Sequence, residues 1–134
     1  MIKNINSKWL LLISVVTAGG PIWFLSYSAF TNTKIIWLSW ILTLMLALLF
    51  CLITKQQNKK VFFTTALGFI TATIFKIVID SIADPSSHNL LPFEVIYYAI
   101  IGFLAATIGV AFGFVIKKIL YRRQDRISRD VPQS

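Results

Sequence analysis

Hydrophobic residues occur in four long, uninterrupted blocks along the chain, separated by short polar stretches. The blocks extend over residues 9–30, 35–54, 61–83 and 93–116. Each block is continuous rather than alternating, which is typical of α-helices and not of membrane β-strands. A helix rises about 1.5 Å per residue, so about 20 residues cross a hydrocarbon core of about 30 Å. The pattern therefore predicts an all-α integral membrane protein with four transmembrane helices.

The polar stretches between the blocks are too short for anything but direct connections. They cover residues 31–34, 55–60 and 84–92. Consecutive helices joined by such short loops lie antiparallel and side by side. We therefore predict that residues 1–134 form a single four-helix transmembrane domain. Residues 117–134 form a basic tail that continues the last helix into the cytoplasm.

The basic residues are distributed unequally between the two predicted sides of the membrane. Eleven of the thirteen lie on the side that carries both termini, Lys34 lies on the other, and Lys76 lies within a block. An excess of Lys and Arg marks the cytoplasmic side. The sequence thus predicts a multi-pass protein of the cytoplasmic membrane with both termini in the cytoplasm. The eleven residues are Lys3, Lys8, Lys55, Lys59, Lys60, Lys117, Lys118, Arg122, Arg123, Arg126 and Arg129.

The first block also permits a different interpretation. Residues 1–8, followed by WLLLISVV and TAG, fit a signal peptide that would be cleaved near Ala18. The apolar run continues beyond that point through PIWFLSYSAF, which favours a retained helix. The remaining helices keep the same orientation in either case.

Composition supports the membrane assignment and offers few chemical groups. Apolar residues make up 57% of the chain and charged residues 13%, against roughly 45–50% and 25% in soluble domains. Cys51 is the single cysteine, so no intramolecular disulfide forms. The chain contains no CxxC, HExxH, phosphate-binding loop or nucleophile elbow. We expect no cofactor and no metal, and a membrane-embedded enzyme is the most distant functional class.

Small residues recur at four-residue steps in the third and fourth blocks. In a membrane, such residues let two helices approach closely. We therefore predict that the third and fourth hydrophobic helices share the closest contact of the bundle. The two rows are Thr64, Gly68 and Ala72, and Ala105, Gly109 and Gly113.

The row on the third helix leads directly to two charged residues. Lys76 and Asp80 are the next two four-residue steps, so they share the same helix face and are expected to face protein. Three interpretations are open. In the first, Lys76 extends to the headgroups, pairs with Asp80 and anchors the helix. In the second, the pair lines an outward-facing polar vestibule, with Glu94 and Tyr97 or Tyr98 on its other wall. In the third, the pair docks oppositely charged groups on a partner's transmembrane helix.

The candidate binding residues are those of this region: Lys76, Asp80, Asp84, His88, Glu94 and Tyr97. Ordinary structural roles also fit some of them. Asp84 precedes Pro85 as a helix N-cap would, and Glu94 follows Pro92 in a first helical turn. His88 with Asp84 makes half of a metal site, whereas structural metal sites use about four ligands.

The basic tail and the overall size limit the functional classes. Residues 117–130 carry six cations and two acids and are expected to bind anionic lipids of the inner leaflet. They lack the interleaved aromatic residues and the binding fold that are typical of nucleic-acid recognition. We predict a non-catalytic subunit or homo-oligomer that binds membrane partners. The alternative is a small transporter or flippase component that uses the vestibule of Lys76, Asp80 and Glu94.

Overall fold

The computed structural model describes residues 6–23, 33–54, 56–85 and 91–130. Within those ranges the chain forms four α-helices and no β-strand, which confirms the predicted all-α class and the number of helices. The helices are α1 (Ser7–Trp23), α3 (Thr33–Ile53), α4 (Asn58–Ala83) and α5 (Leu91–Asp130).

The helix bounds follow the hydrophobic blocks closely. α4 begins three residues before its block, and both end at Ala83. α1 runs through Gly19 and Gly20 with Pro21 inside the helix, and residues 24–30 of the first block lie outside the described residues. α5 continues for 40 residues, so the prediction that the basic tail extends the last helix is confirmed as far as Asp130.

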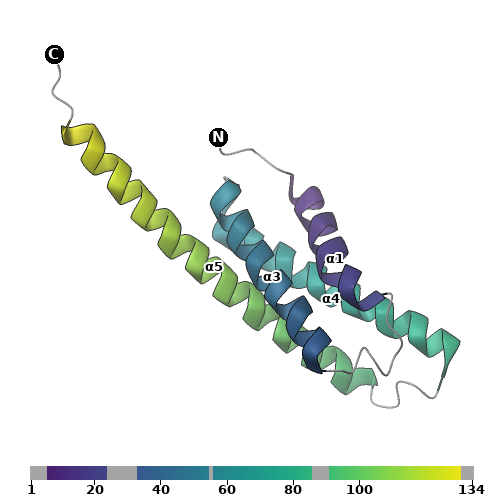
Figure 1. Cartoon of the computed structure of the whole chain (residues 1–134). Helices are drawn as coiled ribbons and strands as arrows, with labels where there is room; N and C mark the ends of the chain where they lie inside the picture. The colour runs from purple at the N-terminus through teal and green to yellow at the C-terminus, as the bar shows by residue number, and fades with distance from the viewer. Residues whose placement is uncertain (1–5, 24–32, 55, 86–90, 131–134) are drawn as a thin grey trace.

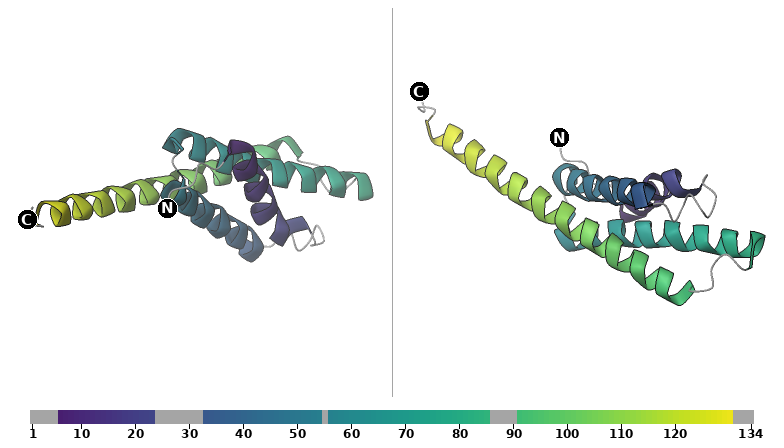
Figure 2. Two further views of the ribbon diagram at one scale, coloured as in Figure 1. Left: turned by 90° about the horizontal axis from the view of Figure 1, so that it is seen from above. Right: turned by 60° about the horizontal axis from the view of Figure 1, so that its bottom comes forward.

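Consecutive helices run in opposite directions, so α1 starts and α5 finishes at the same end of the bundle (Figure 1). At about 1.5 Å per residue, the 40 residues of α5 are about 60 Å long. Its C-terminal part therefore extends beyond the other three helices (Figure 2).

The pairing of the helices differs from the prediction. The most extensive contacts join α3 to α5 and α1 to α4, and the α4–α5 contact comes third. The expectation that the third and fourth hydrophobic helices make the closest contact is therefore wrong. α5 instead packs on both α3 and α4, and α4 packs on both α1 and α5.

The small residues do mark close contacts, but with other partners. A Cβ added at Gly109 would overlap the backbone carbonyl oxygen of Leu44 on α3. A Cβ at Gly68 would overlap the side chain of Ser14 on α1. Of the glycines on α5, Gly102 is the one that meets α4, where a Cβ would lie 2.7 Å from Cδ1 of Phe69. Spacing thus predicts that a helix face packs closely, but not which helix packs against it.

The interior of the bundle is rich in small and hydroxylated side chains. Each of several buried hydroxyls donates to the backbone carbonyl four residues earlier, as Ser14 does to Leu10, Thr43 to Ser39 and Thr65 to Val61, all at 2.8 Å. A hydroxyl bonded in this way needs no further partner and packs as a small residue. The buried polar residues besides Lys76 are Ser14, Ser39, Thr43, Thr54, Thr65 and Thr73.

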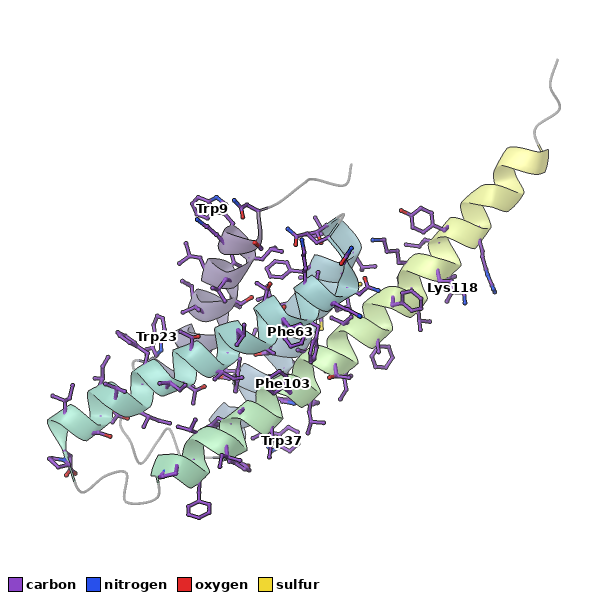
Figure 3. The ribbon with its side chains drawn as sticks, turned by 180° about the vertical axis from the view of Figure 1, so that it is seen from behind. Trp9, Trp23, Trp37, Phe63, Phe103 and Lys118 are labelled. Atoms are coloured by element: carbon purple, nitrogen blue, oxygen red, sulfur yellow. The ribbon has the colours of Figure 1, made fainter. Side chains whose placement is uncertain are left out.

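Large apolar side chains cover the outside instead. Ile82 is 78% exposed, Phe93 70% and Trp9 61%, and Figure 3 shows Trp9 directed away from the bundle. Two helical stretches, Asn58–Ala83 and Pro92–Arg123, are long and apolar enough to cross a membrane by length and composition. Trp37–Ile53 is a shorter apolar stretch.

Candidate functional site

Lys76 and Asp80 form an ion pair on consecutive turns of α4. The Lys76 Nζ lies 2.7 Å from Oδ1 of Asp80, and the two side chains are 6% and 13% exposed. The prediction that these charges face protein is therefore confirmed.

The end of α1 covers the row of α4 that leads to the pair. Gly68, Ala72 and Lys76 are all buried at four-residue steps. The indole N–H of Trp23 donates to the backbone carbonyl of Ala72 at 3.0 Å. The Trp23 ring also meets the ring of Phe75 edge-on at 5.8 Å between centroids. Figure 3 shows Trp23 at the end of α1, against α4.

The direction of the Lys76 side chain bears on the three interpretations. Asp80 is one turn closer to the C-terminal end of α4, so the lysine does extend toward that end of the helix. Its ammonium group, however, meets a carboxylate inside the protein rather than an exposed position. The pairing with Asp80 is common to the anchoring and the vestibule interpretations, and the low exposure of both side chains shows that the pair is enclosed by protein.

A buried pair of this kind is neutral as a unit and sensitive to the loss of either partner. Removing two charges from water costs several kcal/mol per ion, roughly offset by their attraction when hydrogen bonds are in place. The ammonium group is a donor and the carboxylate an acceptor. A donor and an acceptor so placed can hold neighbouring elements together or bind a charged ligand.

Asp84 has a different role from the predicted one. It is the C-cap of α4, where its backbone N–H donates to the carbonyl of Asp80 at 2.8 Å. The expectation that it caps the start of a helix is wrong, because the chain turns at Asp84 and Pro85 directly after α4. Its side chain is exposed.

The start of α5 places one tyrosine inside and one outside. Glu94 lies half-buried in the first turn, as predicted. Tyr97 is 54% exposed, whereas Tyr98 is 6% exposed and packs in a core cluster with Ile77 and Phe69 of α4. Of the two tyrosines left open by the sequence, Tyr98 is therefore the one that faces α4, and Tyr97 is exposed.

The remaining candidate lies outside the described residues. His88 falls in the range 86–90, which the structure does not describe. Among the residues that it does describe, no group of three or more His, Cys, Asp or Glu side chains could hold a metal ion.

One contact at the opposite end was not predicted. The Lys117 ammonium group donates to the backbone carbonyls of Cys51 and Thr54 at the end of α3, at 3.4 Å each. A cation at this position offsets the partial negative charge of a helix C-terminus. The sequence gives Lys117 as the first charged residue after the fourth block, which marks a boundary but not a contact with α3.

Comparison with known proteins gives no match: no protein-family model, curated protein or solved structure matches the chain. Its function is therefore inferred from its own residues and geometry.

Proposed function

We propose that the chain is an integral membrane protein of four spans that acts as a non-catalytic subunit or homo-oligomer, binding membrane partners. The observation that carries this proposal is the inverted distribution of side chains. Glycine, alanine and hydroxyls bonded within their own helix make up much of the helix contacts, beside a few large residues such as Phe50, Phe69 and Ile77, while most of the large apolar side chains face outward. A soluble bundle places its large apolar residues inside, whereas membrane helices associate through small residues.

The lengths of the helices support four spans rather than two. α3 has 21 residues, about 30 Å at about 1.5 Å per residue, which equals the thickness of the hydrocarbon core. α1 has 17 described residues, and the apolar block of the sequence continues to residue 30. Each helix also packs on two or more of the others, with α1 and α3 inclined to α4 and α5 (Figures 1 and 2).

The charges support the orientation with both termini in the cytoplasm. Lys8 at the start of α1, Lys59 and Lys60 at the start of α4, and Lys117 and Lys118 of α5 belong to the same end of the bundle. Figure 3 shows Lys118 on α5 near the end of the bundle where α4 begins. One basic end is what the positive-inside rule expects of the cytoplasmic side.

Close helix contacts support a partner-binding role over a pore within one chain. The contacts of Gly109 with α3 and of Gly68 with α1 leave no room for a Cβ, and hence none for a solute at these points. A path across the membrane would have to lie between copies of the chain or between the chain and a partner.

The mass of the solubilised protein tests this role. We expect the full chain, extracted in a mild detergent, to run as a multiple of 15.2 kDa or in a fixed ratio with a second membrane protein. Light scattering coupled to size-exclusion chromatography, with the detergent contribution subtracted, measures this directly. A single chain alone, at every protein concentration and in every mild detergent, would contradict the proposal.

Transport is the second candidate function, and the buried ion pair favours it. Ionisable residues inside membrane spans frequently mark substrate pathways. Lys76 and Asp80 are enclosed at the end of the bundle opposite to the basic one, where Glu94 begins α5 half-buried. A homodimer with a polar cavity at this end, together with loss of function without loss of stability in variants of the pair, would favour transport.

A further inference from the structure

A continuous groove follows α5 where it passes the start of α4. It consists of two adjoining depressions of about 490 Å³ and about 470 Å³ that share Asn58 and Phe114 as lining residues. Each volume falls within the range of about 300–1,000 Å³ that is typical of small-molecule sites.

The two halves of the groove differ in chemistry. The first is lined mainly by apolar side chains: Phe62 of α4 and Val110, Ala111 and Phe114 of α5, with Thr107 at its far end. The second is lined by the cations Lys117, Lys118 and Arg122, together with Tyr121. The first half also includes the polar residues Asn58 and Lys59 at the start of α4. None of the residues that line either half is acidic.

The length of the apolar half of the groove along α5 matches the thickness of one leaflet of a membrane. Ten residues separate Thr107 from Lys117, which is about 15 Å at about 1.5 Å per residue. This is half of a hydrocarbon core of about 30 Å. The apolar half thus has the depth of one leaflet, and the cations begin where the headgroups would lie.

We propose that this groove binds one anionic phospholipid. An acyl chain lies against Phe62, Ala111 and Phe114, and the phosphate binds Lys118 and Arg122. Arginine suits this role because its guanidinium group can donate two parallel hydrogen bonds to phosphate. Lys117 contributes charge, but its ammonium group is already directed to the end of α3. The inference rests on the proposed insertion in a membrane and adds a defined lipid site to it.

Lipid binding by the purified full chain tests the site. Native mass spectrometry in detergent counts the lipids retained when phosphatidylglycerol or phosphatidylcholine with the same acyl chains is titrated in. We expect one phosphatidylglycerol to be retained in preference. Lys118→Gln with Arg122→Gln should weaken its binding roughly 30-fold, at the usual contribution of each cation to anionic lipid binding.

Matched variants distinguish lipid binding in the groove from a general attraction of anionic lipid to the basic end of the bundle. Lys8→Gln with Lys60→Gln removes the same charge from exposed positions at the same end of the bundle, outside the groove lining, and should leave binding unchanged. Thr107→Trp should fill the groove and abolish retention of the lipid. Thr71→Trp, at an exposed threonine of α4 outside the lining, should not.

Several results would overturn the inference. One is equal retention of phosphatidylglycerol and phosphatidylcholine. Another is an equal loss of phosphatidylglycerol binding in the Lys118/Arg122 and the Lys8/Lys60 double variants. A third is displacement of phosphatidylglycerol by inorganic phosphate at the same concentration. Alkaline carbonate washing of membranes shows whether only the lipid site is absent or whether the chain is not inserted in the membrane at all. A protein that stays in the membrane without preferring phosphatidylglycerol refutes the lipid site alone, whereas a protein released by the wash refutes the membrane assignment.

Discussion

Replacing Lys76 with methionine should destabilise the protein by about 3–5 kcal/mol, because breaking a buried ion pair strands the other charge. Methionine retains most of the apolar stem of the buried lysine, so the packing of that stem should change little. The carboxylate of Asp80, 13% exposed, then loses the ammonium group at 2.7 Å. The loss is measured as a fall in the thermal unfolding midpoint of the purified protein in detergent.

A double-mutant cycle shows whether this cost comes from the pair itself. Asp80→Asn alone should also destabilise the protein, since it removes the carboxylate charge to which the buried Lys76 ammonium group donates at 2.7 Å. The two changes together should recover most of the stability, because removing both charges of a buried pair is often tolerated. Additive losses in the double variant would contradict the pairing.

Two further results of the same cycle concern function. Lys60→Met, at an exposed lysine near the start of α4, is the control and should have little effect on stability. Full stability with lost cellular function in Lys76→Met would identify a binding or transport site instead of a structural pair. The burial of the pair leads us to expect the structural result.

Gly109→Ala should destabilise the protein by about 1–3 kcal/mol, the usual cost of overpacking. The added Cβ would overlap the backbone carbonyl oxygen of Leu44, so α3 and α5 must move apart. This loss outweighs the gain of up to about 1 kcal/mol that alanine brings to a helix interior. Gly20→Ala is the matched control, because nothing lies within 4 Å of a Cβ there, and it should be neutral or stabilising. Thermal unfolding in detergent compares the two variants, and equal effects would show that the α3–α5 contact is looser than described.

Trimming the neighbouring side chain distinguishes two kinds of close contact. At Gly109 the overlap is with backbone, so Leu44→Ala should not rescue Gly109→Ala. At Gly102 the overlap is with the ring of Phe69, so Phe69→Leu should relieve part of the cost of Gly102→Ala.

Hydropathy alone predicted the helices well, because the long apolar runs that a membrane-spanning helix requires can be read directly from the sequence. The blocks 35–54 and 61–83 agree with α3 and α4 to within three residues at each end. The basic tail continues the helix beyond the last apolar block, and α5 extends to Asp130. The face of Lys76 and Asp80 was also predictable, since the two residues extend a row of small residues.

Contacts between helices were not predictable in the same way. The row that contains Gly109 indicates a close approach, but both α3 and α4 were available as partners, and nothing in a four-residue period selects α3. Tyr97 and Tyr98 are adjacent in the sequence, yet about 100° of helix rotation separates them and buries Tyr98 alone. Asp84 stands before a proline and after a helix, and its structure shows that the preceding helix determines its role.

Topology in living cells tests the central claim, four membrane spans with both termini in the cytoplasm, most directly. Fusions of a reporter that is active on one side of the membrane, placed after residues 57, 88 and 134, give one result for each predicted side. The account predicts cytoplasmic, external and cytoplasmic signals in that order. An external signal at residue 134, or the same side for residues 57 and 88, would contradict it.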